Sequence, residues 1–249
     1  MKTRQNFRLN IEYDGTPFSG WQRQQDKTTV QGEIEKALST IINKPIHISG
    51  SGRTDAGVHA LGQVASFRTE TKLSCTEIKS GLNSLIKSPI VIHDCIFASD
   101  DFHAQYSAVS KEYQYVILNR ENPSAIGRSY HLHIRHPLDL DAVQQCCRLI
   151  TGRYNFQSFE NTGSPKNSTI REIFFATITR TKADKVFFDI CANGFLKNMV
   201  RNIVGTLILV GLNKISAAAF DEIFHSYDRT RTGPTAPAHG LFLKRVNYS

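Results

Sequence analysis

The sequence of 249 residues predicts an α+β fold. Duplicated split βαβ (ferredoxin-like) units are expected to form a mixed, mostly antiparallel sheet with helices on one face and a central active-site cleft. Segments with the two-residue period of strands and segments with the helical period follow the order β-α-β-β-α-β, and that order occurs twice. The halves share no visible sequence identity, so the duplication rests on element order alone.

The first half begins with a strand in which Phe7, Leu9, Ile11 and Tyr13 alternate with polar residues. Its second helix begins with a capping box formed by Ser74 and Glu77. The expected elements are the strand 6–13, the helix 30–42, the strands 46–49 and 62–69, the helix 74–86 and the strand 90–98.

The second half repeats this order with one extra helix. Its long helix has Leu196, Val200 and Ile203 on an apolar face, with Lys197 and Arg201 four residues apart on another. The expected elements are the strand 111–118, the helix 140–150, a hairpin of strands 169–181 and 185–193, the helices 194–211 and 216–226, and the closing strand 241–248. We therefore expect an N-terminal α/β subdomain at residues 1–110 and a C-terminal α/β subdomain at residues 111–249 that completes the cleft.

The composition gives a first indication of partners. A net charge of +8, with basic residues spread along the chain, favours acidic partners, and nucleic acid is the first of these. The alternative interpretation is a soluble protein that is merely basic. No apolar signal-peptide segment or bilayer-length apolar run is visible, so we expect a soluble, cytoplasmic protein without membrane contact.

The cysteines and histidines do not form a recognisable metal motif. The five cysteines include no CxxC pair and are expected to be reduced and mostly buried. His131, His133 and His136 are expected on a strand end and a loop instead of around a metal ion.

The stretch GSGRTDAGVHALGQ at residues 50–63 is the most unusual in the chain. It is neither a Walker loop nor a GxGxxG fingerprint, and the chain has no nucleophile elbow and no zinc-deaminase cysteine pair. One interpretation is a glycine-rich turn in which Asp55 caps backbone N–H groups. The other is that the glycines, more than one turn needs, admit another backbone and hold Asp55 at strand ends facing a cleft.

The segment GSGRTDAGVHALGQVASF resembles the signature of the tRNA pseudouridine synthase A (TruA-type) family. The resemblance extends over nearly the full length, in the family's order. Its other blocks are EYDGTPFSGWQRQ, TVQGEIEKAL, FHAQYSAVSKEYQYVI, Thr169–Ile173, NGFLKNMVRNIVGTLILVG and GPTAPAHGLFLKRVNY.

The resemblance implies a role for individual residues. Asp55 matches the single catalytic aspartate, the nucleophile, and places the catalytic loop in the N-terminal subdomain. Arg53 matches the arginine of base flipping, and Arg201 the basic residue that pairs with the aspartate. Tyr113 matches the tyrosine that stacks on the uracil, and Leu241 the apolar floor beside it. Tyr115, on the same face of its strand as Tyr113, is expected in the core.

The family's reaction agrees with these residue types. Pseudouridine formation moves the uracil from an N1 to a C5 glycosidic bond without oxidation, so no cofactor and no metal is expected. The carboxylate must stay ionised, and a cation such as Arg201 favours the ionised form. Whether Asp55 attacks the ribose or the base, or abstracts a ribose proton, stays open. The target base must be flipped out at a cost of a few kcal/mol, and stacking on a tyrosine returns roughly 1–3 kcal/mol.

The resemblance further implies action on uridines 38–40 of the tRNA anticodon stem-loop by a homodimer that holds the tRNA across both subunits. Three departures from the family pattern are Gln105 for arginine, Tyr154-Asn155 for His-Asp and Thr232 for alanine. None of them falls on a residue matched to the chemistry, so we expect them to affect RNA affinity or the choice of uridines. A non-catalytic RNA-binding or tRNA-folding module on the same scaffold is the alternative function, and a synthase for another RNA is a third.

Overall fold

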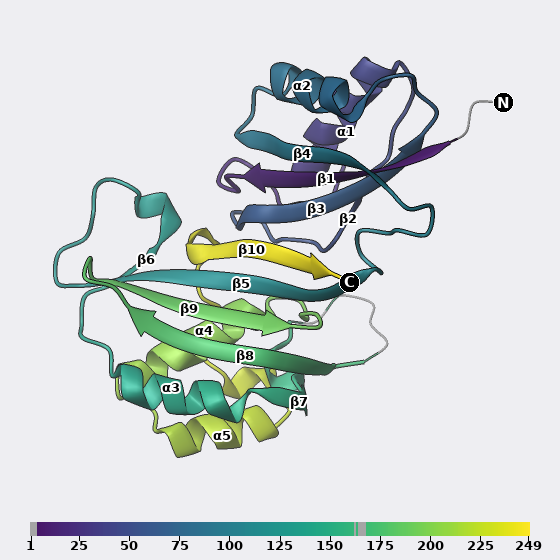
Figure 1. Ribbon diagram of the computed structural model, residues 1–249. Helices are drawn as coiled ribbons and strands as arrows, with labels where there is room; N and C mark the ends of the chain where they lie inside the picture. Colours follow the sequence, from purple (N-terminus) through teal and green to yellow (C-terminus); the bar gives the residue numbers. More distant parts are fainter. Residues whose placement is uncertain (1–3, 162, 164–167) are drawn as a thin grey trace. The chain divides into compact units, whose positions relative to one another are not determined.

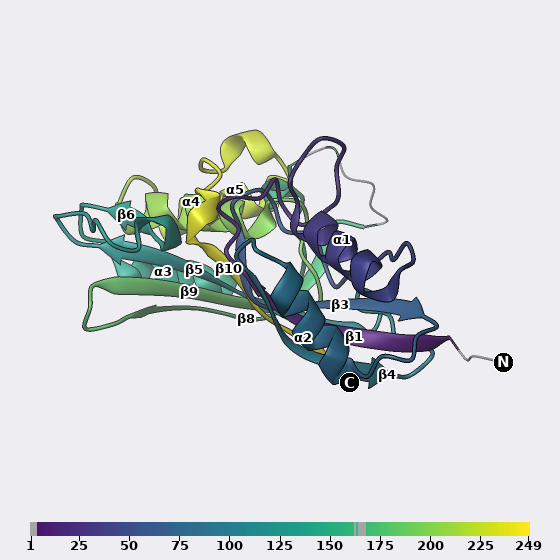
Figure 2. The ribbon, with the colours of Figure 1, turned by 90° about the horizontal axis from the view of Figure 1, so that it is seen from above.

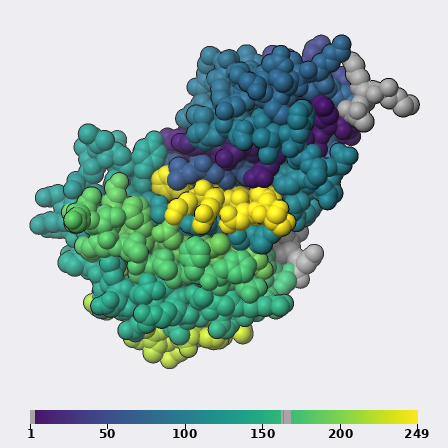
Figure 3. Space-filling model, viewed as in Figure 1, coloured from purple at the N-terminus to yellow at the C-terminus, as the bar shows by residue number. Residues whose placement is uncertain are grey.

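The structure is a computed structural model that describes residues 4–161, 163 and 168–249. Its described residues form two compact units, 4–109 with 242–249, and those between 110 and 241. The closing strand, expected in the C-terminal subdomain, is part of the first unit because Phe242 and Leu243 pair with His59 and Ala60. In Figure 3 the yellow atoms of the last residues lie beside blue atoms of this unit.

The first unit has the split βαβ topology. Its strand order is β4-β1-β3-β10, and β2 pairs with β3 (Figure 1). β1 is antiparallel to both β3 and β4, and β2 is antiparallel to β3. The helices α1 and α2 lie side by side (Figure 2). The elements are β1 (Gln5–Tyr13), α1 (Val30–Ile42), β2 (Ser49–Gly50), β3 (His59–Thr69), α2 (Cys75–Leu85), β4 (Ile90–Ala98) and β10 (Leu241–Tyr248).

Burial along β1 explains why the helices cover one face of these strands. Phe7, Leu9 and Ile11 are fully buried, whereas the residues between them are partly exposed. The ring of Phe7 stacks on that of Phe67 in the neighbouring strand β3, with ring centroids 4.9 Å apart. The two-residue alternation read from the sequence therefore places one apolar face against the helices.

The second unit repeats the arrangement. β9 lies between β5 and β8 and is antiparallel to both, as β3 lies between β1 and β2. β7 pairs with β8, and the short β6 is parallel to β5. The duplicated split βαβ fold is thus confirmed. The elements are β5 (Ala108–Asn119), β6 (Leu132–Ile134), α3 (Leu140–Leu149), β7 (Gly152–Asn155), β8 (Ile170–Arg180), β9 (Lys185–Ala192), α4 (Met199–Gly211) and α5 (Ala217–His225), with short 3₁₀ helices at 128–130, 157–159, 229–231 and 238–240.

Several element predictions are wrong in their bounds. The strands expected at 62–69 and 111–118 begin three residues earlier, at His59 and Ala108. The expected helix 194–211 begins only at Met199, because Asn198 adopts a left-handed conformation with φ of 59°. Lys197 therefore precedes the helix and does not share a helical face with Arg201. The strands β6 and β7 were not predicted, since each is only three or four residues long.

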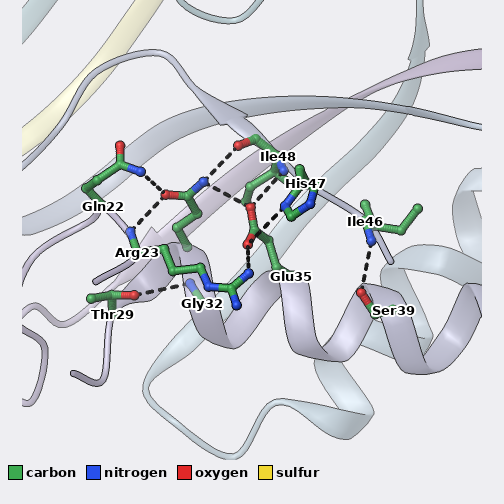
Figure 4. Close-up of polar contacts among 10 residues, drawn as sticks. Gln22, Arg23, Thr29, Gly32, Glu35, Ser39, Ile46, His47 and Ile48 are labelled. Atoms are coloured by element: carbon green, nitrogen blue, oxygen red, sulfur yellow. Dashed lines mark hydrogen bonds and ion pairs between the residues drawn. The ribbon is translucent and has the colours of Figure 1, made fainter. Parts of the chain in front are cut away.

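The expected strand 46–49 is also wrong, because side chains of α1 take its backbone N–H groups (Figure 4). Ser39 Oγ accepts from Ile46 N at 3.0 Å, and Glu35 Oε1 accepts from Ile48 N at 3.0 Å. Glu35 is buried and also accepts from Gln31 Nε2 at 2.9 Å, while its Oε2 lies 3.4 Å from Arg23 Nη1. The segment is thus held on the helix, and only Ser49–Gly50 pairs with β3.

Replacing Glu35 tests this anchoring. Glu35→Ala leaves the buried N–H of Ile48 without its acceptor, so we expect the free energy of unfolding to fall by about 1–3 kcal/mol. Chemical denaturation measures the change. Lys36→Ala, an exposed neighbour on α1, is the control and should change stability little. An equally stable Glu35→Ala variant would show that the segment is fixed by apolar packing alone.

Candidate active site

Asp55 and Arg53 lie on one loop of the first unit, between β2 and β3. Asp55 is half-buried and Arg53 is exposed. A turn begins at Asp55, where the backbone carbonyl accepts a hydrogen bond from Val58 N at 3.2 Å. The loop thus presents an arginine and a carboxylate two residues apart at the start of β3.

Thr54, between these two residues, fixes the loop. It is buried, its Oγ1 lies 2.7 Å from the hydroxyl of Tyr13, and its carbonyl accepts from Trp21 N at 3.1 Å. Burial raises the pKa of Tyr13 to about 12, so the phenol is neutral at pH 7. Asp55 therefore follows a residue that is held by both its side chain and its backbone.

A glycine of the β1–α1 connection makes this contact possible. Gly20 has a φ of +95°, and a Cβ at this position would lie 2.7 Å from the carbonyl oxygen of Thr54. No larger residue fits there without moving the loop. The expectation that another backbone approaches the glycine-rich stretch holds, but the glycine that allows this contact lies in the block EYDGTPFSGWQRQ.

The other end of the loop is tied to β3. Ser51 Oγ lies 2.6 Å from Gln63 Oε1, and Gln63 Nε2 donates to the carbonyl of Gly52 at 3.0 Å. Both side chains are fully buried. The loop is thus anchored before Arg53, at Ser51 and Gly52, and between Arg53 and Asp55, at Thr54, as a site that must hold a carboxylate in place requires.

Tyr113 and Tyr115 lie on the same face of β5 in the second unit. Tyr115 is fully buried and donates to the carbonyl of Pro237 at 2.8 Å, so its predicted core role is confirmed. Burial also raises its pKa. Tyr113 keeps 7% of its surface exposed and packs edge-to-face against Phe195, with centroids 5.1 Å apart.

Arg201 occupies the first turn of α4. Its Nε donates to the carbonyl of Ala236 at 2.7 Å, and its Nη1 donates to Asn198 Oδ1 at 3.0 Å. Its backbone carbonyl accepts from Ala236 N at 3.0 Å. The segment around Ala236 therefore fixes the direction in which this guanidinium extends. Leu241, five residues later, is buried.

Arg229 holds that segment on α4 and was missed by the sequence analysis. It donates to Asn202 Oδ1 and to Thr235 Oγ1, both at 2.9 Å. Thr235 Oγ1 in turn donates to Asn202 Oδ1 at 2.7 Å. The remaining acceptors of Arg229 are Asn161 Oδ1, Thr232 Oγ1 and the carbonyl of Gly233. Thr232, a departure from the family pattern, is thus part of this network.

A second close backbone contact accompanies the network. A Cβ at Gly205 would lie 1.7 Å from the carbonyl oxygen of Pro234, so α4 and the segment GPTAPA touch through their backbones. Gly233 N donates to Thr206 Oγ1 at 3.0 Å in the same place. The signal in the sequence was the glycine in the middle of an otherwise apolar helix.

The predicted site residues divide between the two units. Arg53 and Asp55 belong to the first unit, and Tyr113, Arg201 and Leu241 to the second. The pairing of Arg201 with Asp55 stays a prediction.

A separate pocket of about 650 Å³ lies in the first unit. Its lining includes Gln22, Arg23, Gln31, Glu35 and His47, and neither Arg53 nor Asp55 is part of it. A hydrogen bond between Gln22 and Gln31 and an ion pair between Arg23 and Glu35 join residues of its lining, which is the character of a structural support (Figure 4).

Within the described ranges, no three His, Cys, Asp or Glu side chains are placed to hold a metal ion. His133 lies in β6, and His131 and His136 flank this strand. Four of the five cysteines are buried, and all five are free thiols. No helix in the described part of the chain has the length and apolarity needed to cross a membrane.

A family model described as tRNA pseudouridine synthase matches residues 10–107 and 146–249. The chain belongs to this family. The match includes the whole Asp55 loop and the α4 and GPTAPA segments. The chain is therefore an isomerase that converts uridine to pseudouridine in tRNA, and a module that only binds RNA is disfavoured.

Individual relatives agree in length and name. The tRNA pseudouridine synthase A of Thermoanaerobacter sp. (strain X514) is 42% identical over 98% of this chain and 99% of its own. That of Caldicellulosiruptor saccharolyticus is 44% identical over the same shares. A chain of the solved Cbf5-Nop10-Gar1 complex aligns with 82% of this chain and 44% of its own, at 12% identity and a TM-score of 0.41, which adds nothing to the assignment.

Arg229→Met tests the network around Arg201. The substitution removes the guanidinium whose hydrogen bonds hold residues 232–235 on α4. The carbonyl of Ala236, which accepts from Arg201 Nε, is then no longer held in place. We expect kcat to fall by about 10²-fold, as for a small misplacement of a reacting group, with a smaller change in tRNA affinity. Single-turnover kinetics and binding separate the two effects.

Arg231→Met is the matched control, since Arg231 is exposed on the same 3₁₀ helix. Thermal melting must show that Arg229→Met is folded before its rate is compared. A folded variant with a normal kcat would mean that the network only stabilises the second unit.

Proposed function

We propose that the chain modifies uridines 38–40 of the tRNA anticodon stem-loop, with Asp55 as the nucleophile. The observation that carries this proposal is the loop itself: a half-buried carboxylate follows Thr54, which Tyr13 and Trp21 hold in place. The name tRNA pseudouridine synthase A, shared by the relatives, supports tRNA as the substrate.

The reaction needs little beyond one carboxylate. The C1′–N1 bond of the uridine breaks, the ring turns, and C1′ bonds to C5. The hydrogen on C5 leaves as a proton and N1 gains one, so atoms and charge balance without an oxidant. Asp55 acts on the ribose or the base, or takes a ribose proton, and no metal or organic cofactor takes part.

Three further residues handle the base. Arg53, which is exposed on the loop, fills the stack that the flipped uridine leaves. Tyr113 stacks on the uracil, and its nearly buried ring, fixed by Phe195, loses little freedom when the base arrives. Leu241 supplies an apolar floor.

Arg201 pairs with Asp55 and keeps it ionised. Its Nε and Nη1 are already oriented by Ala236 and Asn198, so the guanidinium is ordered before any substrate binds. An ordered cation stabilises a carboxylate at a lower entropic cost than a mobile one. The protein acts in the cytoplasm as a homodimer across whose subunits the tRNA lies.

Asp55→Asn tests the proposal directly. The substitution keeps the size of the side chain and removes its charge and nucleophilicity, so pseudouridine formation should be abolished while tRNA binding persists. Tritium release from tRNA labelled at C5 measures the reaction, and pseudouridine mapping gives its positions. Asp100→Asn, an exposed carboxylate of the same unit, should keep the wild-type rate. Modification at other positions would overturn the site choice, and turnover by Asp55→Asn would overturn the role of Asp55.

Arg201→Met tests the pairing. Methionine keeps much of the aliphatic stem, so packing on α4 should persist while the rate falls by roughly 10²-fold. Arg201→Lys restores the charge without the fork and should recover part of the rate. Equal loss in both variants would point to orientation by hydrogen bonds instead of charge, and normal turnover in Arg201→Met would exclude the pairing.

A further inference from the structure

Two cations of the second unit share one face of the sheet. Lys111 on β5 and Ile173 on β8 are both paired with Ala192 of the intervening β9. Paired residues of antiparallel strands point to the same side, and so do residues two apart in one strand. Arg171 therefore shares this face with Lys111, and so does Tyr113, two residues along β5.

No acid neutralises this pair in the described part of the chain. The side chain of Lys111 makes no hydrogen bond or ion pair with a described residue. Arg171 Nη1 donates only to backbone carbonyls, those of Ser168 at 2.9 Å and Ile170 at 2.6 Å. The acids next to them in sequence, Glu112 and Glu172, point to the opposite face because side chains alternate along a strand.

The surroundings make the pair electrostatically unfavourable. Burial, and then the positive charge of Arg171, lower the pKa of Lys111 to about 8. Burial also lowers the pKa of Arg171. Two half-buried cations that repel each other destabilise the protein unless an anion binds between them.

We propose that Lys111 and Arg171 form a subsite for one RNA phosphate, the phosphodiester next to the uridine whose base lies on Tyr113. The proposal rests on the proposed function, since it uses the stacking role of Tyr113. Two residues of a strand span about 6.6 Å, on the order of the reach from a base to its own phosphate. Arg171 supplies directed N–H donors, held by its bonds to Ser168 and Ile170, and Lys111 supplies a point charge.

The first test asks whether Lys111→Met and the neutralisation of one RNA phosphate affect the same contact. A set of anticodon stem-loop RNAs is made, each with a neutral methylphosphonate at one position around the target uridine. The affinity of each RNA is measured with the wild-type protein and with Lys111→Met. The wild-type protein should bind the RNA less tightly when the methylphosphonate is at one position flanking the uridine. The affinity of Lys111→Met should not fall further when that phosphate is neutralised. Its slope of log K against log salt should be smaller by roughly 0.7–0.9, as for one lost contact.

Lys182→Met, on the exposed turn between β8 and β9, should keep the wild-type slope and the wild-type response to every methylphosphonate. Thermal melting supplies a second readout. Since the ammonium group of Lys111 has no acceptor among the described residues, its replacement should not lower the melting temperature, whereas replacing a lysine kept for packing would. Losses that add independently at every phosphate would overturn the subsite.

The second test follows the charge of Lys111 directly. NMR titration of ¹³C-methylated lysines should give a pKa near 8 for Lys111 in the free protein. A bound phosphate favours the charged form, so the same RNA should raise this pKa. Arg171→Gln should raise it without RNA, because the like charge is gone. An unchanged pKa in the complex would overturn the proposal.

The two proposals fail in different ways. Wild type that forms no pseudouridine in these RNAs contradicts the proposed function. Wild type that is active, but shows no coupling between Lys111 and any phosphate, contradicts the subsite alone.

Discussion

The contact between the backbone of the β1–α1 connection and the loop 51–58 is the constraint on which the first unit depends. The carbonyl of Thr54 accepts a hydrogen bond from Trp21 N, and its hydroxyl is hydrogen-bonded to that of Tyr13. Only a glycine at position 20 leaves room for the Thr54 carbonyl. This requirement explains the glycine at position 20. A carboxylate on a mobile loop would spend much of its time away from the substrate, and this packing prevents that.

The second unit fixes its segments in a similar way. There the backbone of α4 touches the segment GPTAPA at Gly205, and Arg229 ties the two together with a fork of hydrogen bonds. Arg201 and the GPTAPA segment are fixed to each other through Ala236. In both units a glycine admits a foreign backbone, and a buried polar network then holds the segment that bears the functional side chain.

The sequence predicted the regular elements well because their signals are local. The helix α1, the capping box of α2 and the hairpin of β8 and β9 follow from periodicity and cap residues. Two errors came from non-local or special contacts. Residues 46–48 read as a strand but give their N–H groups to Ser39 and Glu35, and Asn198 stops α4 from starting earlier. The site residues came from resemblance, since neither periodicity nor charge distinguishes Asp55 or Arg201 from other polar residues. Arg229 and Lys111 needed coordinates, because their importance lies in partners far apart in sequence.

The parallel pairing of β10 with β3 has a consequence for synthesis on the ribosome. Residues 242–248 belong to the first unit but are translated after all of residues 110–241. While the second unit emerges, the edge of β3 that will receive β10 has open N–H and C=O groups at His59 and Ala60, just beyond the Asp55 loop. The unit that is made first is therefore completed last. The strand that follows the Asp55 loop therefore acquires this neighbour only after Phe242 and Leu243 have been made.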